Sequence, residues 1–186
     1  MKKIYLFALT VTVIFISCQN KKSSDFAFNT ELDSINVSLN DSALGSNFQS
    51  VDFEKLPRLT MAEYDSLQLQ KVTGLEGYDT TYLSLGKTLL VNNAGKIITI
   101  QVITDGEISE YLISYDKDGN IKDNLIVAYE DMVEYYSQTS SKINADQITV
   151  QAINFNYSDK DDNALESSDT LISKYKITPD FNFVPN

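Results

Sequence analysis

The feature that most constrains the fold of this chain is a series of short turn motifs between segments of alternating apolar residues. The turns are expected at residues 92–95, 105–106, 118–120 and 144–146, where Asn, Asp and Gly cluster. Asp-Gly pairs such as Asp105-Gly106 supply the positive φ of a tight hairpin. Because parallel strands need long crossover connections, loops this short predict antiparallel neighbours.

The segments between these turns have the period of two that strands require. Apolar or aromatic side chains alternate over the residues Ile98, Ile100 and Val102; Tyr111, Ile113 and Tyr115; Ile121, Leu125, Val127 and Tyr129; Ile148 and Val150, followed by Ile153, Phe155 and Tyr157; and Leu171, Tyr175 and Ile177. This pattern predicts strands. A short closing strand is expected near Phe181–Val184. In residues 130–137 the spacing is helical, so a helical turn and a bulged strand both fit.

One short helix is predicted before the strands. Thr60 and Glu63 have the spacing of a capping box, and Met61, Tyr64 and Leu67 follow at intervals of three. The expected helix spans residues 61–70. We therefore predict that residues 55–186 form a single, mainly β domain, an antiparallel meander or sandwich-like fold with one short N-terminal helix.

The first residues have the layout of an export signal. Lys2 and Lys3 precede an uncharged stretch from Ile4 to Ile16, and Ser17 and Cys18 close it. As a helix this stretch would rise only about 20 Å, which is too short for a bilayer core of about 30 Å. The sequence therefore predicts a signal peptide over residues 1–17 and not a permanent membrane span.

The residues Phe15-Ile16-Ser17-Cys18 resemble a bacterial lipobox. Ser17 is the small residue expected before the cysteine, and Phe15 takes the place of the usual leucine. The resemblance implies that Cys18 becomes the first mature residue and bears acyl chains such as palmitate, which anchor the protein in a membrane. It also implies a small envelope lipoprotein of Bacteroidota type, most often in the outer membrane. The alternative is an ordinary signal peptide with an accidental cysteine.

Residues 18–54 are expected to form a lipidated flexible tether, because Ser, Asn and Asp are frequent and apolar residues are isolated. Alternation at Ile35, Val37 and Leu39 leaves a short strand open. Asp-Ser and Asp-Thr triplets in the chain resemble the O-glycosylation acceptor of exported Bacteroidota proteins. In the tether, this resemblance implies Ser34 and Ser42 as glycosylation candidates.

Composition excludes most catalytic centres. The chain has no histidine and one cysteine, so it cannot form a Ser-His-Asp triad, a Cys-His pair or a histidine-containing zinc site. Carboxylate chemistry remains, but Glu107 and Glu110 have odd spacing and are expected on opposite strand faces. We predict no catalytic residues, no cofactor and no enzyme activity. A net charge of −11 without a basic run argues against nucleic acid as a partner.

Two acidic segments are weak calcium candidates. The first contains Asp116, Asp118, Asn120 and Asp123, and the second, expected as a loop between strands, contains Asp159, Asp161, Asp162, Asn163 and Glu166. Carboxylates are calcium ligands, but the EF-hand spacing is absent. A solvated acidic loop is the simpler interpretation of both segments.

Together these features predict a lipid-anchored cell-envelope protein with a non-catalytic β-rich binding or structural domain. The membrane is its expected partner through the anchor, and a protein or glycan partner stays open. Tyrosines on alternating strand positions would suit stacking on sugars or peptides if exposed. The alternative function is a small carboxylate-dependent glycan hydrolase or a calcium-dependent glycan binder at the envelope.

Overall fold

The computed structural model describes residues 42–45, 48, 52–134, 136–158 and 161–186, which belong to one compact unit within Ser34–Asn186. The helical elements are the 3-10 helix η2 (Phe53–Lys55), the α-helix α1 (Met61–Ser66) and the 3-10 helix η3 (Leu69–Lys71). The strands are β1 (Ser42–Leu44), β2 (Leu83–Asn92), β3 (Gly95–Ile103), β4 (Glu107–Asp116), β5 (Ile121–Asp131), β6 (Ser137–Asn144), β7 (Gln147–Ser158), β8 (Asp161–Ile177) and β9 (Phe183–Pro185).

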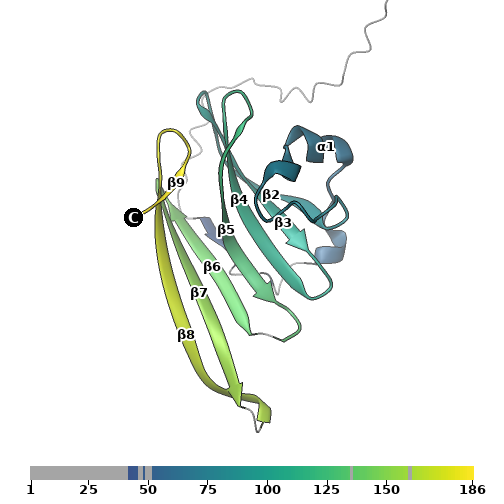
Figure 1. Cartoon of the computed structure of the whole chain (residues 1–186), viewed down its shortest axis with the longest axis vertical. Helices are drawn as coiled ribbons and strands as arrows, with labels where there is room; N and C mark the ends of the chain where they lie inside the picture. Colours follow the sequence, from purple (N-terminus) through teal and green to yellow (C-terminus); the bar gives the residue numbers. More distant parts are fainter. Residues whose placement is uncertain (1–41, 46–47, 49–51, 135, 159–160) are drawn as a thin grey trace, which may run out of the picture. The chain divides into compact units, whose positions relative to one another are not determined.

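These strands form one antiparallel sheet in the order β2-β3-β4-β5-β6-β7-β8-β9, with β1 paired to β6 (Figure 1). From β2 onward each strand lies beside its neighbour in sequence. The mainly β fold class and the antiparallel meander predicted from the short turns are confirmed.

The predicted turns form, but Gly106 does not have the positive φ that was expected of the Asp105-Gly106 pair. The Asn92 side-chain oxygen accepts hydrogen bonds from the main-chain N–H groups of Ala94 and Gly95, at 2.8 and 3.1 Å. In the turn between β4 and β5, Gly119 has a φ of +82°. Each of the four motifs joins consecutive strands, as the sequence predicts.

The capping box that begins α1 is also confirmed. The Thr60 hydroxyl accepts a hydrogen bond from the main-chain N–H of Glu63, and the Glu63 carboxylate accepts one from the N–H of Thr60 at 2.8 Å. The helix is shorter than the predicted 61–70. It ends at Ser66 because Gln68 adopts the left-handed conformation, with a φ of 53°, before η3 begins.

The segment between β5 and β6 has neither of the two expected forms. β5 continues to Asp131, and the chain then bends over residues 132–134. The Asp131 carboxylate accepts hydrogen bonds from the N–H groups of Val133 and Glu134, at 3.0 and 2.9 Å. The chain bend is thus stabilised by a side-chain carboxylate that accepts hydrogen bonds from two successive main-chain N–H groups, and neither a helical turn nor a bulge forms.

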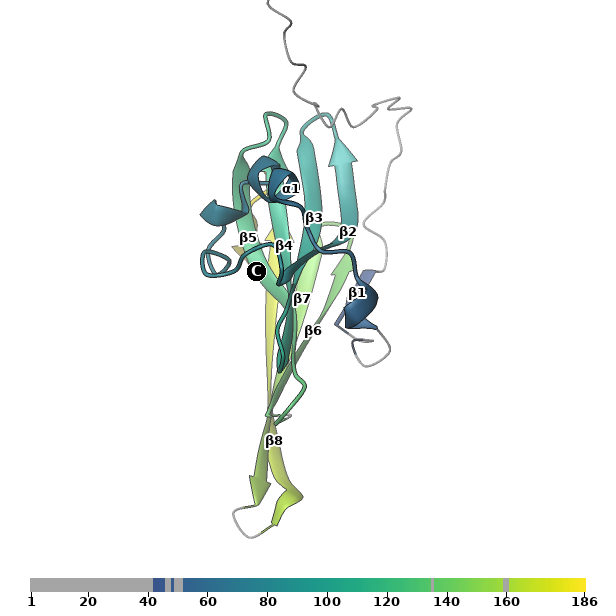
Figure 2. The same ribbon diagram turned by 90° about the vertical axis from the view of Figure 1, so that its right-hand side faces the viewer.

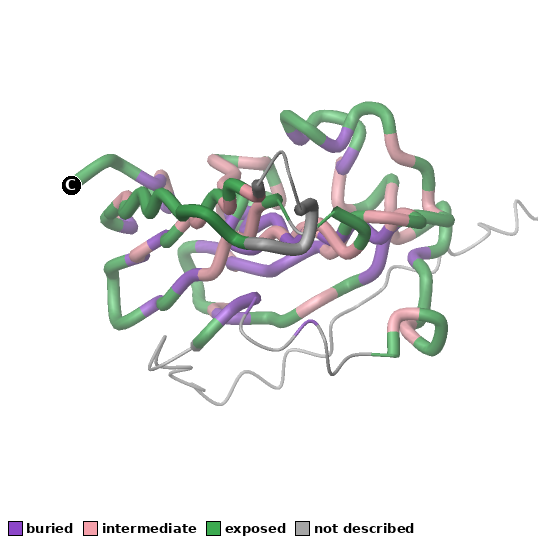
Figure 3. The backbone as a smooth tube through the Cα atoms, turned by 90° about the horizontal axis from the view of Figure 1, so that it is seen from below, coloured by how far each residue is buried: buried purple, intermediate pink, exposed green. Residues whose placement is uncertain are grey.

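The β2–β5 part of the sheet is covered on both faces. The segment containing α1 lies against one face, and β6–β9 lie toward the other side, as Figures 1 and 2 show. The buried cluster under the helical segment contains Leu59, Leu69, Val72, Leu75, Leu83, Ile98, Ile100, Val102, Tyr111, Ile113 and Tyr115. The cluster between the two parts of the sheet contains Leu44, Leu89, Ile97, Leu112, Val127, Ile143, Ile148, Val150, Ile177, Phe181 and Phe183. Buried residues accordingly concentrate along the central strands in Figure 3.

β1 places the start of the folded domain upstream of the predicted boundary at residue 54. Leu44 is 1% exposed and belongs to the core, and Phe48 packs with Ile108 and Ala128 in a third buried cluster. A strand of three residues, Ser42-Ala43-Leu44, is too short to show a periodic pattern in the sequence. The described residues of 42–54 therefore belong to the domain and not to a flexible tether.

Residues 1–41 lie outside the described part of the chain. The predicted signal peptide, the lipobox with Cys18 and the glycosylation candidate Ser34 all fall there. Among the residues that the structure describes, no helix has the length and apolar character needed to cross a bilayer.

Candidate functional site

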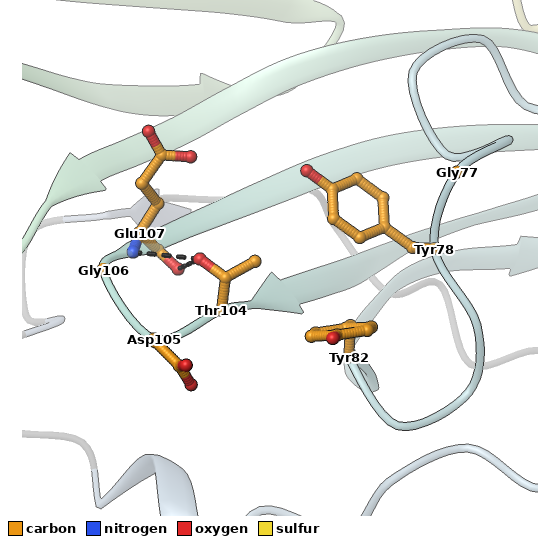
Figure 4. Close-up of a pocket in the computed structure, with 7 residues that line it drawn as sticks. All are labelled: Gly77, Tyr78, Tyr82, Thr104, Asp105, Gly106 and Glu107. Carbon is orange, nitrogen blue, oxygen red and sulfur yellow. Dashed lines mark hydrogen bonds between the residues drawn. The ribbon is translucent and has the colours of Figure 1, made fainter.

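A shallow, open depression lies where the turn between β3 and β4 meets the loop that precedes β2 (Figure 4). Its volume is about 570 Å³. Its lining residues are Gly77, Tyr78, Tyr82, Thr104, Asp105, Gly106 and Glu107. Two segments distant in sequence thus build one surface, with tyrosines on one side and carboxylates on the other.

The carboxylate side is held by the predicted Asp105-Gly106 turn. The Thr104 N–H donates to the Glu107 carbonyl oxygen at 3.0 Å, and the Glu107 N–H donates to Thr104 Oγ1 at 3.1 Å. The Gly106 carbonyl oxygen accepts a hydrogen bond from the Met132 N–H at 2.8 Å. These bonds tie the turn to itself and to the segment after β5, so Asp105 and Glu107 extend from an ordered base.

The tyrosine side comes from the loop after η3. The rings of Tyr78 and Tyr82 lie edge to face, with centroids 6.0 Å apart and an interplanar angle of 65°. Between them, the Asp79 carboxylate accepts hydrogen bonds from the Thr81 hydroxyl and N–H, which lower the pKa of Asp79. The Tyr82 carbonyl oxygen accepts from the Ile103 N–H at 2.9 Å, which attaches the loop to β3.

The depression has a negative character. Its lining contains two carboxylates and no lysine or arginine. The Glu107 carboxylate accepts a hydrogen bond from the Tyr129 hydroxyl at 2.9 Å. Burial, together with this bond and the nearby negative charge, raises the pKa of Tyr129 to about 12, so the phenol stays a donor at neutral pH. In Figure 4 the carboxylates of Asp105 and Glu107 point away from each other.

Glu110 lies on the other face of β4, as its odd spacing from Glu107 predicts. It is only 3% exposed, and Thr99 Oγ1 donates a hydrogen bond to its carboxylate at 2.6 Å. The Lys87 N–H donates in turn to Thr99 Oγ1 at 2.7 Å. Burial raises the pKa of Glu110, against the opposing effects of the Thr99 bond and the Lys87 charge. Glu107 and Glu110 therefore do not form a catalytic pair.

In the first calcium candidate, the acidic side chains form hydrogen bonds and an ion pair with other groups of the protein. The Asp116 carboxylate accepts hydrogen bonds from the Asn120 side chain and from the N–H groups of Asn120 and Asp118, which lower the pKa of Asp116. Asp118 pairs with Lys117 at 2.8 Å. The Asp123 carboxylate accepts from the Phe183 N–H at 2.7 Å. These contacts account for the acidic turn without a cation.

The second calcium candidate does not lie in a loop over most of its length. β8 begins at Asp161, so Asp161, Asp162 and Glu166 are strand residues, and Glu166 is exposed. Asp159 lies outside the described residues. Within the described part of the chain, no group of three or more acidic or cysteine side chains has the arrangement of a metal site. A calcium site here stays a prediction without structural support.

Of the two glycosylation candidates, only Ser42 falls in the described residues. It is the first residue of β1, opposite Ile143 of β6. Its modification stays a prediction, as does that of Ser34.

Sequence reasoning did not identify the depression. Asp105 was expected only as a turn residue, and Tyr78 and Tyr82 have no periodic pattern that separates them from other tyrosines. The site depends on the loop before β2 reaching the turn after β3, a contact between segments about 25 residues apart that no local motif encodes.

Comparisons with known proteins do not assign this chain to a family. No family model matches the chain, and searches among curated proteins and among solved structures find no match.

Proposed function

We propose that this chain is a lipid-anchored cell-envelope protein whose β domain binds a ligand and does not catalyse a reaction. The observation that supports binding is the open depression with Tyr78 and Tyr82 on one side and Asp105 and Glu107 on the other. Tyr82 is 41% exposed, so its ring is available to a ligand. Aromatic rings beside carboxylates suit a ligand with an apolar face and several hydroxyl donors, and glycans combine the two.

The geometry supports binding over the alternative of glycan hydrolysis. A glycosidase needs two carboxyl groups on either side of the scissile bond, about 5 to 10 Å apart and directed at it. Asp105 and Glu107 diverge (Figure 4), and Glu110 is buried on the other strand face. Two diverging carboxylates across from two tyrosine rings are suited to orienting a ligand, which supports the proposal of binding.

Glycan binding is tested by replacing one tyrosine. We expect full-length protein to bind oligosaccharides on a glycan microarray, and Tyr82→Ala to weaken the strongest interaction about tenfold by isothermal titration calorimetry, because a ring contact is lost. Tyr136→Ala is the matched control, since Tyr136 is 51% exposed but does not line the depression. Equal weakening by both variants, or no glycan bound by the wild type, would contradict the proposal.

The anchor is proposed from the lipobox resemblance at Cys18 together with the uncharged stretch before it. Several acyl chains, at about 0.8 kcal/mol per buried CH₂, hold a protein stably on a membrane where one chain is marginal. We expect the native protein to enter the detergent-rich phase on phase separation and Cys18→Ala to remain in the aqueous phase. Equal partitioning of both would count against the anchor, and it would leave the binding proposal intact.

A further inference from the structure

The two edges of the sheet differ in their protection against another strand. β2 forms one edge, and its register with β3 shifts between Leu85 and Thr88 and again between Thr88 and Leu90. Upstream chain also covers this edge, because Arg58 forms a β-bridge with Ser84. Bulges and covering segments are devices by which natural sheets prevent edge-to-edge pairing. The β2 edge is therefore irregular in its middle and covered at Ser84.

β8 forms the opposite edge of the sheet and lacks this protection in its middle (Figure 1). β9 pairs only with Tyr175–Ile177, so within the described chain no strand lies beside the outer edge from Leu165 to Ser173. The register with β7 shifts between Leu165 and Ser167 but is uninterrupted from Ser167 to Lys176. Ser167–Ser173 contains no proline or lysine, and Asp169 is its one charged residue. This edge is a regular template for main-chain pairing.

The main-chain groups that face this edge can be identified. The Lys174 carbonyl oxygen accepts a hydrogen bond from the Asn186 N–H at 2.9 Å, on the side of β8 away from β7. Because main-chain groups of an antiparallel strand alternate between its two sides, those of Ser168, Thr170 and Ile172 face the same way. The edge therefore presents donors and acceptors at every second residue.

Two neighbouring apolar side chains on this edge show what kind of partner fits. Leu171 and Ile172 are 65% and 59% exposed. Consecutive strand residues point to opposite faces of a sheet, so a protein that docks on one face covers only one of them. A strand added at the edge brings side chains beside both.

We propose that β8 pairs with β8 of a second copy of this chain. The two strands run antiparallel about a two-fold axis at Thr170, and the two sheets join into one. This interface is isologous, the commonest form of a homodimer contact. The proposal goes beyond ligand binding and does not depend on the anchor.

Hydrogen-bond geometry restricts the register of such a pair. In an antiparallel ladder, outward-facing residues pair with outward-facing residues. With the axis at Thr170, each Thr170 lies opposite its copy, and Ser168 lies opposite Ile172 of the second copy. All the outward-facing groups between Ser168 and Ile172 then find partners, and threonine pairs across strands are favourable.

Charge also favours the axis at Thr170. This register keeps the two Asp169 carboxylates off the two-fold axis, because each Asp169 lies opposite Leu171 of the second copy. An axis at Asp169 would place two Asp169 carboxylates directly opposite each other, which is destabilising. An axis at Leu171 would extend the pairing into Lys174, whose carbonyl oxygen is already bonded to Asn186.

The interface is tested by measuring the mass of the full chain in detergent-containing solution by sedimentation. We expect the wild type to be a dimer at micromolar concentration and Thr170→Pro to be a monomer, because proline removes an outward N–H that β7 does not use. The control is Gln151→Lys. Gln151 is exposed and lies opposite Ile172 on β7, so the variant adds charge to the same face without touching the edge. We expect it to remain a dimer.

Two outcomes of this measurement would overturn the proposal. A wild type that remains monomeric at high micromolar concentration shows that the edge does not pair. Loss of the dimer in Gln151→Lys as well as in Thr170→Pro shows that the partner docks on the face of the sheet. Circular dichroism of Thr170→Pro establishes that the variant is folded.

A cross-link tests the same register without relying on that variant. In a Cys18→Ser background, Thr170→Cys should form a disulfide-linked dimer on mild oxidation, since directly opposite residues lie about 5.5 Å apart between Cα atoms, within disulfide range. Gln151→Cys, one strand inward, should stay uncross-linked. Cross-linking by Leu171→Cys but not by Thr170→Cys would overturn the axis at Thr170.

Discussion

At the scale of single residues, Glu110 is a carboxyl group whose charged form is disfavoured by burial. Its carboxylate is buried, with one hydrogen bond from Thr99 and a lysine, Lys87, as a neighbouring charge. Gly86 makes room for it, because a Cβ on Gly86 would lie 3.0 Å from Glu110 Oε1 and 2.2 Å from Thr99 Oγ1. The local backbone thus accommodates the acid, while burial still favours its protonated form.

This burial predicts how stability changes with pH. Because the folded protein raises the pKa of Glu110 above its ordinary value of 4.5, the folded state binds this proton more tightly than the unfolded state. Its contribution to the free energy of unfolding is full below pH 4.5 and is lost as the pH rises through the folded pKa. Glu110→Gln should therefore become more stable relative to wild type as the pH is raised from about 4.5 to 7.

The measurement is the thermal midpoint of both proteins across that range. Glu107→Gln is the control, since Glu107 lies on the same strand but at the open depression. The same trend in Glu107→Gln would show that loss of either carboxylate from β4 produces it, and would contradict the assignment to Glu110. If the thermal midpoints of wild type and Glu110→Gln differed by the same amount at every pH, Glu110 would not be the source of the pH dependence of stability.

The sequence predicted the strand face on which Glu110 lies, but it did not predict that Glu110 is buried. Its odd spacing from Glu107 is enough to place the two on opposite faces, because strand geometry fixes that alternation. Burial depends on what covers the face, and Phe48 packs there with Ile108 and Ala128. Phe48 comes from a polar segment with no periodic signal, so its arrival beside β4 is a tertiary event.

At the scale of elements, predictions succeeded where the chemistry is local. Side chains hydrogen-bond to nearby main-chain groups at Asn92, at Asp116 and in the Thr60–Glu63 pair. The two turns and the start of the helix therefore form at the predicted positions. The end of α1 was predicted too late, since Leu67 continues the apolar spacing. β1 was missed because a three-residue strand is stabilised by its partner β6 and not by its own pattern.

β1 supplies a test of where the domain begins. Leu44→Ala should reduce the free energy of unfolding by about 2–5 kcal/mol in urea denaturation, because Leu44 is buried between the two parts of the sheet. Met61→Ala should change it by less than about 0.5 kcal/mol, since Met61 is 60% exposed. If Leu44→Ala were as mild as Met61→Ala, β1 would not be part of the stable fold.

At the scale of the whole domain, the order of strands follows from short loops, but the way the two parts of the sheet pack together does not. The Ser114 hydroxyl donates to the Phe181 carbonyl oxygen at 2.6 Å, and the Asp123 carboxylate accepts from the Phe183 N–H at 2.7 Å. These bonds join β4 and β5 to β9 and to the turn before it, across 67 and 60 residues. No local sequence motif predicts these hydrogen bonds. No local motif predicts the contact between the two segments that line the tyrosine depression either.

The pairing of β1 with β6 also fixes an order of events when the polypeptide is made. Ser42–Leu44 leave the ribosome early, yet their partner residues Ser141–Ile143 follow only after the four strands β2–β5. Until then Leu44 has no ladder to join, so it is a contact with high sequence separation that forms late. A nascent chain halted before β6 should consequently present its front segment to chaperones and proteases, however well β2–β5 have already assembled.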